Sequence, residues 1–232
     1  MRDSLSKAGR RRAADVLARR TKRGSGQQER RQAVQGGGPS LERIFEGTLS
    51  ALSRRGAKQL SMTDVCEAAG ISRATLYRYF ARKADLLAAL SEYVVSRFVE
   101  GVKAAAANAK EPHEKLRAVL EFMVTFTSKV KADRILEVEP EFVAKSLREQ
   151  FPRHLAAIGE ALEPVFRAFE KRLGYPLSRT FISELLLRAQ ESTTLIPAGA
   201  RWNTLPETLA DFARDFLEEG TGRKPRGRGR GV

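Results

Sequence analysis

The sequence predicts an all-α protein, and three observations carry that prediction. Apolar residues recur at helical spacing from residue 40 to about residue 220, Gly and Pro separate the periodic stretches, and no stretch alternates as a half-buried strand does. The expected architecture is a small N-terminal three-helix domain followed by a larger helical domain. A chain of 232 residues is long enough to bury a substantial core in one or two domains.

The positive charge of the chain is concentrated at its two ends. The net charge is +14, of which residues 1–39 contribute +8 and residues 221–232 contribute +5. We expect a basic, mostly disordered extension over 1–39 and a basic, Gly/Arg-rich disordered tail over 221–232. Contact with DNA phosphates or a minor groove, and a role in solubility alone, both remain open for these segments.

The first helix of the folded part is expected to begin at Ser40 and to end at Gly56. Two short helices joined by a tight turn are expected between Ser61 and Phe80. Ser61 suits the cap of the first short helix, and Gly70, which tolerates a left-handed backbone, suits its end.

The second short helix begins after Ser72 and should bury Leu76 and Phe80 on one face. Its other side chains include two arginines and two tyrosines, Arg73, Tyr77, Arg78 and Tyr79. Folding does not require such an outer face. DNA binding does, because the second helix of a helix-turn-helix enters the major groove.

Residues 40–90 resemble the DNA-binding domain of the TetR family of bacterial repressors. The resemblance rests mainly on Thr75-Leu76-Tyr77, Tyr79-Phe80, Lys83 and Asp85-Leu86-Leu87. Beyond Leu90 only the helical layout is similar. The resemblance implies a TetR-like fold, with a helix-turn-helix DNA-binding domain at 40–90 and a helical effector-binding and dimerisation domain at 91–220.

Particular side chains around the second short helix suit contacts with DNA. Arg73 is expected to read a base, because a guanidinium pairs with guanine in a bidentate manner, and the resemblance implies Thr63 as a second candidate reader. Thr75 suits a thymine methyl or a phosphate. The resemblance implies phosphate contacts for Tyr77, Tyr79 and Lys83, which would fix register rather than sequence. The full predicted DNA-binding set is Ser61, Thr63, Arg73, Ala74, Thr75, Tyr77, Arg78, Tyr79 and Lys83.

Two members of that set carry a qualification. Ala74 stands where family members often have Gly, a difference that would restrict close approach to DNA. Arg78 suits DNA contact and a solvated position equally well.

The remainder of the chain is expected to be helical at 81–107, 114–130, 140–150, 151–173, 177–194 and 204–219, with a loop at 197–203. The alternating acids of 136–141 are typical of a solvated loop. Leu185-Leu186-Leu187 makes the helix at 177–194 apolar on more than one face. The resemblance implies a homodimer formed by the helices at about 177–194 and 204–219, and ordinary core helices of a monomer are the alternative. Twofold symmetry would predict a near-palindromic operator.

Apolar side chains of the middle helices are candidates for an effector pocket, and each is equally a candidate for plain core. The set is Phe98, Val102, Phe122, Met123, Phe126, Phe142, Phe166 and Phe169. The sequence does not identify the small molecule.

Several other classes of function are not expected. His113 and His154 stand apart without partners at metal-ligand spacing, and we expect neither a metal site, nor a cofactor, nor an enzyme. The single Cys66 excludes an intramolecular disulfide, suits a buried structural position and fits the reducing cytoplasm. No apolar run is long enough to span a membrane.

These observations predict a cytoplasmic, dimeric transcriptional repressor. It would bind a double-stranded DNA operator and be released from it by a small apolar effector. The alternative is an architectural DNA binder with little sequence selectivity, dominated by its basic tails.

Overall fold

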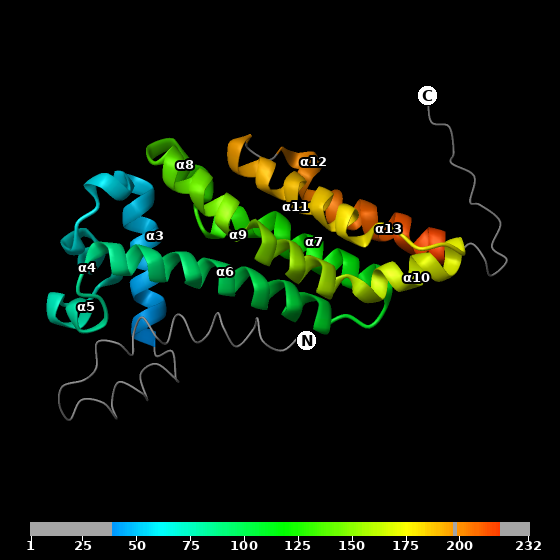
Figure 1. Ribbon diagram of the computed structural model, residues 1–232, viewed down its shortest axis with the longest axis horizontal. Coiled ribbons are helices and arrows are strands. Elements are labelled where there is room, and N and C mark those ends of the chain that lie inside the picture. The colour runs from blue at the N-terminus through cyan, green and yellow to red at the C-terminus, as the bar shows by residue number, and fades with distance from the viewer. Residues whose placement is uncertain (1–38, 197–198, 219–232) are drawn as a thin grey trace. The chain divides into compact units, whose positions relative to one another are not determined.

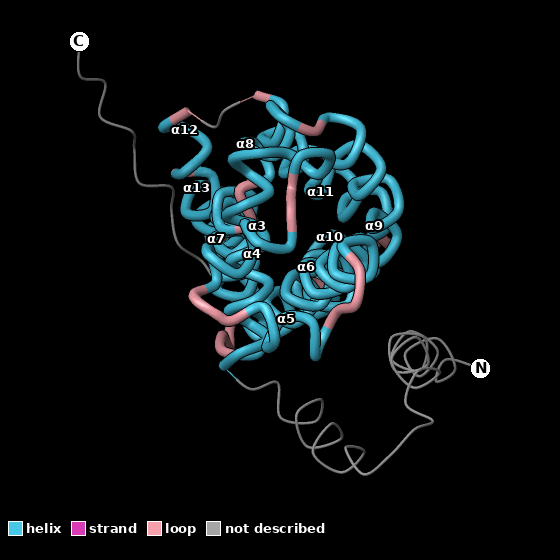
Figure 2. The backbone as a smooth tube through the Cα atoms, turned by 90° about the vertical axis from the view of Figure 1, so that its left-hand side faces the viewer, coloured by secondary structure: helices cyan, strands magenta, loops and turns pink. Residues whose placement is uncertain are grey.

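The computed structural model describes residues 39–196 and 199–218, and every regular element within those ranges is an α-helix (Figure 1). The predicted all-α class is therefore confirmed. Figure 2 shows these helices joined by short loops. The chain divides into two compact units, Met1–Val94 (unit 1) and Val95–Val232 (unit 2). The predictions for the basic segments 1–38 and 219–232 lie outside the described residues.

Unit 1 contains α3 (Pro39–Gln59), α4 (Met62–Ala69), α5 (Arg73–Tyr79) and the first part of α6 (Lys83–Ala107). Gly56 interrupts α3 with a φ of 73°, where the sequence predicted the helix to end, but a further turn continues to Gln59. All four helices contribute to one apolar core. Its buried side chains include Ile44, Phe45, Leu49, Leu52, Val65, Leu76, Phe80, Leu86 and Leu90.

Helices α3 and α4 approach each other closely at Gly47. A Cβ atom on Gly47 would lie 2.6 Å from the Cβ of Ala69 and 2.7 Å from its backbone nitrogen and Cα. Nη2 of Arg43 donates hydrogen bonds to the carbonyls of Ala69 (3.1 Å) and Gly70 (3.0 Å). Arg43 of α3 thereby satisfies carbonyl groups at the end of α4, which have no partner within that helix.

Unit 2 contains the rest of α6 and the helices that follow it. They are α7 (Pro112–Lys129), α8 (Ala132–Val138), α9 (Pro140–Ala161), α10 (Glu163–Leu173), α11 (Arg179–Leu195), α12 (Ala200–Asn203) and α13 (Leu205–Glu218). Helix α7 packs against α13, α10 and α11, and α11 packs against α9 (Figure 1). None of the helices in the described ranges is long and apolar enough to cross a membrane.

The sequence-based boundaries were wrong at four places in unit 2. One is Leu162, where the helix predicted at 151–173 is divided into α9 and α10. A break was predicted between Gln150 and Phe151, but α9 continues through Pro152 as far as Ala161. Pro152 lies inside α9 and is exposed, so its ring is not part of the core. Helices α8 and α12 occupy parts of two stretches that were predicted to be loops.

Candidate functional site

A reciprocal cap fixes the start of α4 in unit 1. Oγ of Ser61 accepts a hydrogen bond from the backbone amide of Asp64 at 3.2 Å, and Oδ2 of Asp64 accepts one from the amide of Ser61 at 2.9 Å. The Ser61 hydroxyl also donates to Oδ2 at 2.7 Å. The side-chain and backbone hydrogen bonds from Ser61 lower the pKa of Asp64, and Arg55, 3.1 Å from Oδ1, acts in the same direction.

The turn and the second short helix are fixed by equally local contacts. Gly70 ends α4 with a left-handed backbone, φ 62° and ψ 42°. Oγ of Ser72 then accepts a hydrogen bond from the amide of Thr75 at 3.1 Å and lies 2.9 Å from its hydroxyl. Leu76 and Phe80 are buried, as predicted. The outward face of α5 is therefore held in a fixed orientation on unit 1.

That outward face carries the predicted DNA-contacting side chains. Arg73, Ala74, Tyr77 and Arg78 are exposed. Thr75 and Tyr79 are half-buried, so only part of each side chain is accessible on the outward face of α5. The guanidinium of Arg78 lies over the ring of its neighbour Tyr79, with 5.3 Å between the guanidinium carbon and the ring centroid.

Two predicted base readers, Thr63 and Arg73, contact each other. Nη2 of Arg73 donates a hydrogen bond to Oγ1 of Thr63 at 2.7 Å. Thr63 belongs to the first turn of α4, and Arg73 is the first residue of α5. The contact therefore joins the two helices of the helix-turn-helix on their outer side.

Lys83 is the first residue of α6, but its ammonium group donates hydrogen bonds to backbone carbonyls of α3. Nζ donates to the carbonyls of Ala57 at 2.9 Å and Lys58 at 3.2 Å. Since an ammonium group has three donors, one of them remains for another acceptor. The phosphate contact of Lys83 stays a prediction.

Unit 1 also matches a known family. Residues 44–90 match the family model for bacterial regulatory proteins of the tetR family. Residues 44–90 therefore form a TetR-type DNA-binding domain. The match covers the caps, the turn and the exposed face of α5 that are described above.

Individual TetR-like relatives match over different lengths. The HTH-type transcriptional regulator BetI of Yersinia pestis (strain Pestoides F) is 30% identical over 82 residues, 34% of this chain and 41% of BetI. This chain thus spans about two fifths of the length of that relative. The nucleoid occlusion factor SlmA of Vibrio atlanticus (strain LGP32) is 24% identical over 157 residues, 66% of this chain and 80% of SlmA.

Solved structures extend the likeness in fold to both units. The fatty acid degradation regulator FadR of Bacillus halodurans has a TM-score of 0.55 and 20% identity, covering 76% of this chain and 95% of FadR. The TetR-family regulator PfmR of Thermus thermophilus has a TM-score of 0.52 and 20% identity, covering 78% of this chain and all of PfmR. FadR of Bacillus subtilis, in complex with stearoyl-CoA, has a TM-score of 0.50 and 16% identity, covering 76% of this chain and 95% of that one.

Three of the predicted effector-pocket residues form an aromatic cluster in unit 2. The ring centroid of Phe98 lies 5.9 Å from that of Phe122 and 5.0 Å from that of Phe126, and the latter two are 5.5 Å apart. Gly101 makes room for Phe122, because a Cβ there would lie 2.2 Å from two of its ring carbons. These contacts define the aromatic cluster: Phe98, Phe122 and Phe126.

The other predicted pocket residues are not all part of this cluster. Phe169 stacks on Phe216 of α13 at 5.2 Å between centroids. The rest are buried or half-buried without a ring contact to the cluster, namely Val102, Met123, Phe142 and Phe166.

A polar side chain that the sequence did not single out as a pocket residue lies beside the aromatic cluster. The ring of His154 lies 4.1 Å from that of Phe98, and His154 is 5% exposed. Burial lowers the pKa of His154 to about 4, so its imidazole is neutral at pH 7. Its Nε2 has no hydrogen-bond partner among the described residues. The helical spacing of buried Gln150, His154 and Ile158 is the sequence signal that would have placed it in the core.

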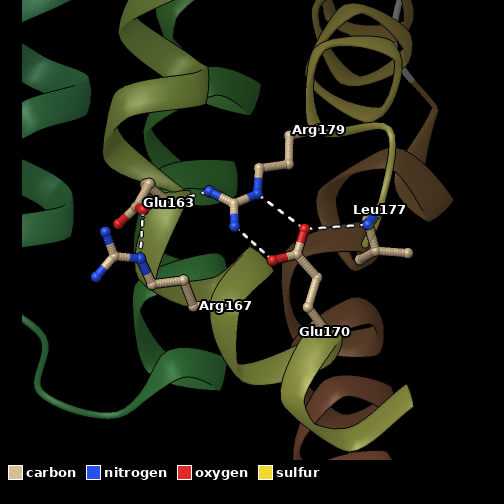
Figure 3. Close-up of polar contacts among 5 residues, drawn as sticks. All are labelled: Glu163, Arg167, Glu170, Leu177 and Arg179. Carbon is tan, nitrogen blue, oxygen red and sulfur yellow. Dashed lines mark hydrogen bonds and ion pairs between the residues drawn. The ribbon is translucent and has the colours of Figure 1, made fainter. Parts of the chain in front are cut away.

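A cluster of ion pairs fixes the turn between α10 and α11 (Figure 3). Arg179 donates to both carboxylate oxygens of Glu170, through Nε at 2.9 Å and through Nη2, and its Nη1 lies 3.3 Å from Glu163. The amide of Leu177 also donates to Glu170, at 3.0 Å. The hydrogen bonds from Arg179 lower the pKa of Glu170 to about 2.

Within the described ranges, 39–196 and 199–218, no group of His, Cys, Asp and Glu side chains is arranged to hold a metal ion. Cys66 is buried and unbonded to another sulfur.

Proposed function

We propose that this protein is a TetR-family transcriptional regulator that binds operator DNA through α4 and α5. The observation that carries the proposal is the capped, outward-facing α5, which presents Arg73 and Tyr77 beside the exposed side of α4. In a helix-turn-helix the second helix enters the major groove. Arg73 would then pair with a base, and Tyr77 and Tyr79 would bind phosphates.

The test compares the full-length protein with Arg73→Ala on DNA flanking its own gene, by fluorescence polarisation. Loss of a bidentate arginine–guanine pair is expected to reduce the preference over scrambled DNA by about 10-fold or more. Arg148→Ala, a change of an exposed arginine in unit 2, is the matched control. An unchanged preference in Arg73→Ala would contradict the proposal.

We propose further that the protein acts as a homodimer through α11 and α13. Both helices expose large apolar side chains, with exposed fractions of 57% for Phe181, 51% for Leu185 and 62% for Phe212. Phe181 and Leu185 are four residues apart and share one face of α11. Large apolar side chains gathered on a surface favour an interaction site.

Sedimentation of the wild type is expected to give a dimer, and Leu185→Glu should give a monomer with weaker operator binding. Thr125→Glu, on an exposed position of α7, adds the same charge outside the proposed interface and should leave the dimer intact. A monomeric wild type would contradict this part of the proposal.

The regulator is proposed to be a repressor that a small, mainly apolar effector releases from DNA. The aromatic cluster and neutral, buried His154 would suit an apolar, uncharged part of such a ligand, for example an acyl chain. An effector shifts the equilibrium only by its differential affinity for the two conformations. Stearoyl-CoA, the ligand in the Bacillus subtilis FadR structure, is the first probe, and DNA release is the readout. Absence of release would exclude this ligand as the effector.

The architectural alternative is favoured by one observation, the concentration of positive charge in residues 1–39 and 221–232. It predicts that a chain trimmed to residues 40–220 loses DNA binding and that the full-length protein shows little sequence preference. Retention of a selective complex by the trimmed chain would reject this alternative.

A further inference from the structure

We infer that Thr63 is a positioning residue, which orients the guanidinium of Arg73 for base recognition and does not itself read a base. The inference rests on the proposed DNA-binding function. It assigns to Thr63 a different role from the direct base contact that the sequence predicted. Its basis is the 2.7 Å hydrogen bond from Nη2 of Arg73 to Oγ1 of Thr63.

The hydrogen bond leaves Arg73 able to recognise guanine. A guanidinium has five N–H donors in a planar fork. Nη2 carries two of them, one directed to the side of Nε and the other to the side of Nη1. Donation of one hydrogen to Thr63 therefore leaves one complete two-donor edge, which is what a bidentate pair with O6 and N7 of guanine requires.

Both ends of this contact are attached to fixed backbone. Thr63 lies in the first turn of α4, which the Ser61–Asp64 cap holds in place. Arg73 is the first residue of α5, directly after the Ser72 cap. Thr63 thus gives an otherwise exposed, flexible arginine a defined direction before DNA arrives. Such preorganisation reduces the ordering cost of binding.

Arg78 provides a contrast on the same helix. Its guanidinium lies over Tyr79, its immediate neighbour in sequence, and this contact does not connect α5 with α4. Arg73 is held across the turn, so its direction depends on the relative placement of both helices. Thr63 therefore links the geometry of the turn to the residue that would read the base.

The hydroxyl can be removed with little change in shape. Thr63→Val deletes the acceptor and keeps the branched side chain, whereas Thr63→Ser keeps the acceptor. Loss of one such hydrogen bond is expected to lower the preference at the base pair read by Arg73 by about 5-fold. The slope of affinity against salt should not change, because no charge is removed. Thr63→Ser should restore most of the preference.

The experiment selects binding sites from a random-sequence duplex DNA library with the full-length protein and its variants. Thr63→Val and Arg73→Ala should relax the same base pair in each half-site, and the double variant should be no less selective than Arg73→Ala alone. Thr125→Val, the same change on an exposed position of unit 2, is the control and should not alter the selected site. Thermal unfolding of each variant verifies that unit 1 remains folded.

The opposite results overturn the inference. If Thr63 reads a base directly, Thr63→Val relaxes a different base pair from Arg73→Ala, and its effect persists when Arg73 is absent. A wild-type protein that selects no sequence from the library overturns the proposed function itself, and the inference with it. A wild type that selects a site, combined with additive effects of the two changes, rejects the positioning role alone.

Discussion

The two units of this protein differ in how their polar groups find hydrogen-bond partners. In unit 1, side chains close the helix ends: Ser61 caps α4, Ser72 caps α5 and Lys83 binds carbonyls at the end of α3. In unit 2, polar atoms remain buried without a partner among the described residues. They are Nε2 of His154, Oγ of Ser183, Oε1 of Glu191 and Nε1 of Trp202.

This difference indicates which unit depends on something outside itself. A buried polar atom without a hydrogen bond destabilises the folded state. The described part of unit 1 has no such side-chain atom. We expect unit 2, in contrast, to gain stability when an effector or second subunit supplies hydrogen bonds.

The largest effect is expected from Gly47→Ala in unit 1. The new Cβ would meet the backbone of Ala69 at 2.7 Å, and a backbone cannot move aside as a side chain can. We expect a loss of about 3 kcal/mol in the free energy of unfolding of unit 1. This value is at the upper end of the destabilisation that overpacking of a core typically causes. Urea unfolding followed by circular dichroism measures it. A loss below the measurement error would show that α3 and α4 can separate freely, and that unit 1 is less rigid than its contacts indicate.

A pH-dependent effect of intermediate size is expected from His154→Phe in unit 2. The pKa of His154 is about 4 in the folded protein and 6.5 ordinarily. Between these values the unfolded chain binds more protons, so the free energy of unfolding falls as the pH falls. This contribution amounts to about 1.5 kcal/mol between pH 6.5 and pH 5. The substitution should abolish it, as measured by urea unfolding at several pH values.

Glu191 provides a control, because its contribution to the free energy of unfolding changes with pH in the opposite direction to that of His154. Burial raises its pKa from 4.5 to about 7, so the folded protein binds more protons between those values and its stability falls as the pH rises. Glu191→Gln should therefore make the acid-induced loss from His154 steeper than in the wild type. Parallel pH profiles for the wild type, His154→Phe and Glu191→Gln would contradict both assignments.

The sequence predicted unit 1 in more detail than unit 2, for a physical reason. Gly70, Ser61 and Ser72 act on backbone groups within a few residues of themselves, so their roles follow from local sequence. The contact between Thr63 and Arg73 was not predicted, because it depends on how α4 and α5 are placed across the turn.

In unit 2 the sequence indicated the periodicity of the helices but not their packing partners. The apolar stripes located most helices, yet they could not show that Phe169 stacks on Phe216 while Phe98 packs with Phe122. A proline within a helix ordinarily ends it, but α9 continues through Pro152. The remaining half of α9 shows that packing of a long buried stripe outweighs that local preference.

Gly101→Ala is expected to have a smaller effect than Gly47→Ala, although its initial contact is shorter. The new Cβ would lie 2.2 Å from ring carbons of Phe122, but this ring belongs to a half-buried side chain that can turn. We expect a loss of about 1 kcal/mol in the free energy of unfolding. Phe122→Leu should rescue part of that loss in the double variant, measured by urea unfolding. If Phe122→Leu rescues none of the loss, the strain lies in the backbone of α6 and not in the ring of Phe122. The substitution would then strain a backbone, as Gly47→Ala does.

The smallest effect on stability is expected from a substitution that removes the ion pairs at the α10–α11 turn. The pKa of Glu170 is about 2 in the folded protein, below its ordinary value of 4.5, because Arg179 donates two hydrogen bonds to it. A lowered carboxyl pKa contributes stability that is complete above pH 4.5 and is lost as the pH falls towards 2. Glu170→Gln should remove this acid-sensitive part and leave the profile above about pH 6 parallel to that of the wild type.

Asp64→Asn in unit 1 is the matched comparison, because the pKa of Asp64 is lowered mainly by Ser61 within the same helix cap. Arg179 is partly exposed, and solvent weakens exposed ion pairs. If Glu170→Gln shifts the sedimentation of the protein as well as its acid unfolding, the cluster also sets the direction of α11 and hence the proposed dimer. If only acid unfolding changes, the cluster stabilises unit 2 locally, in the same way that the Ser61 cap stabilises unit 1.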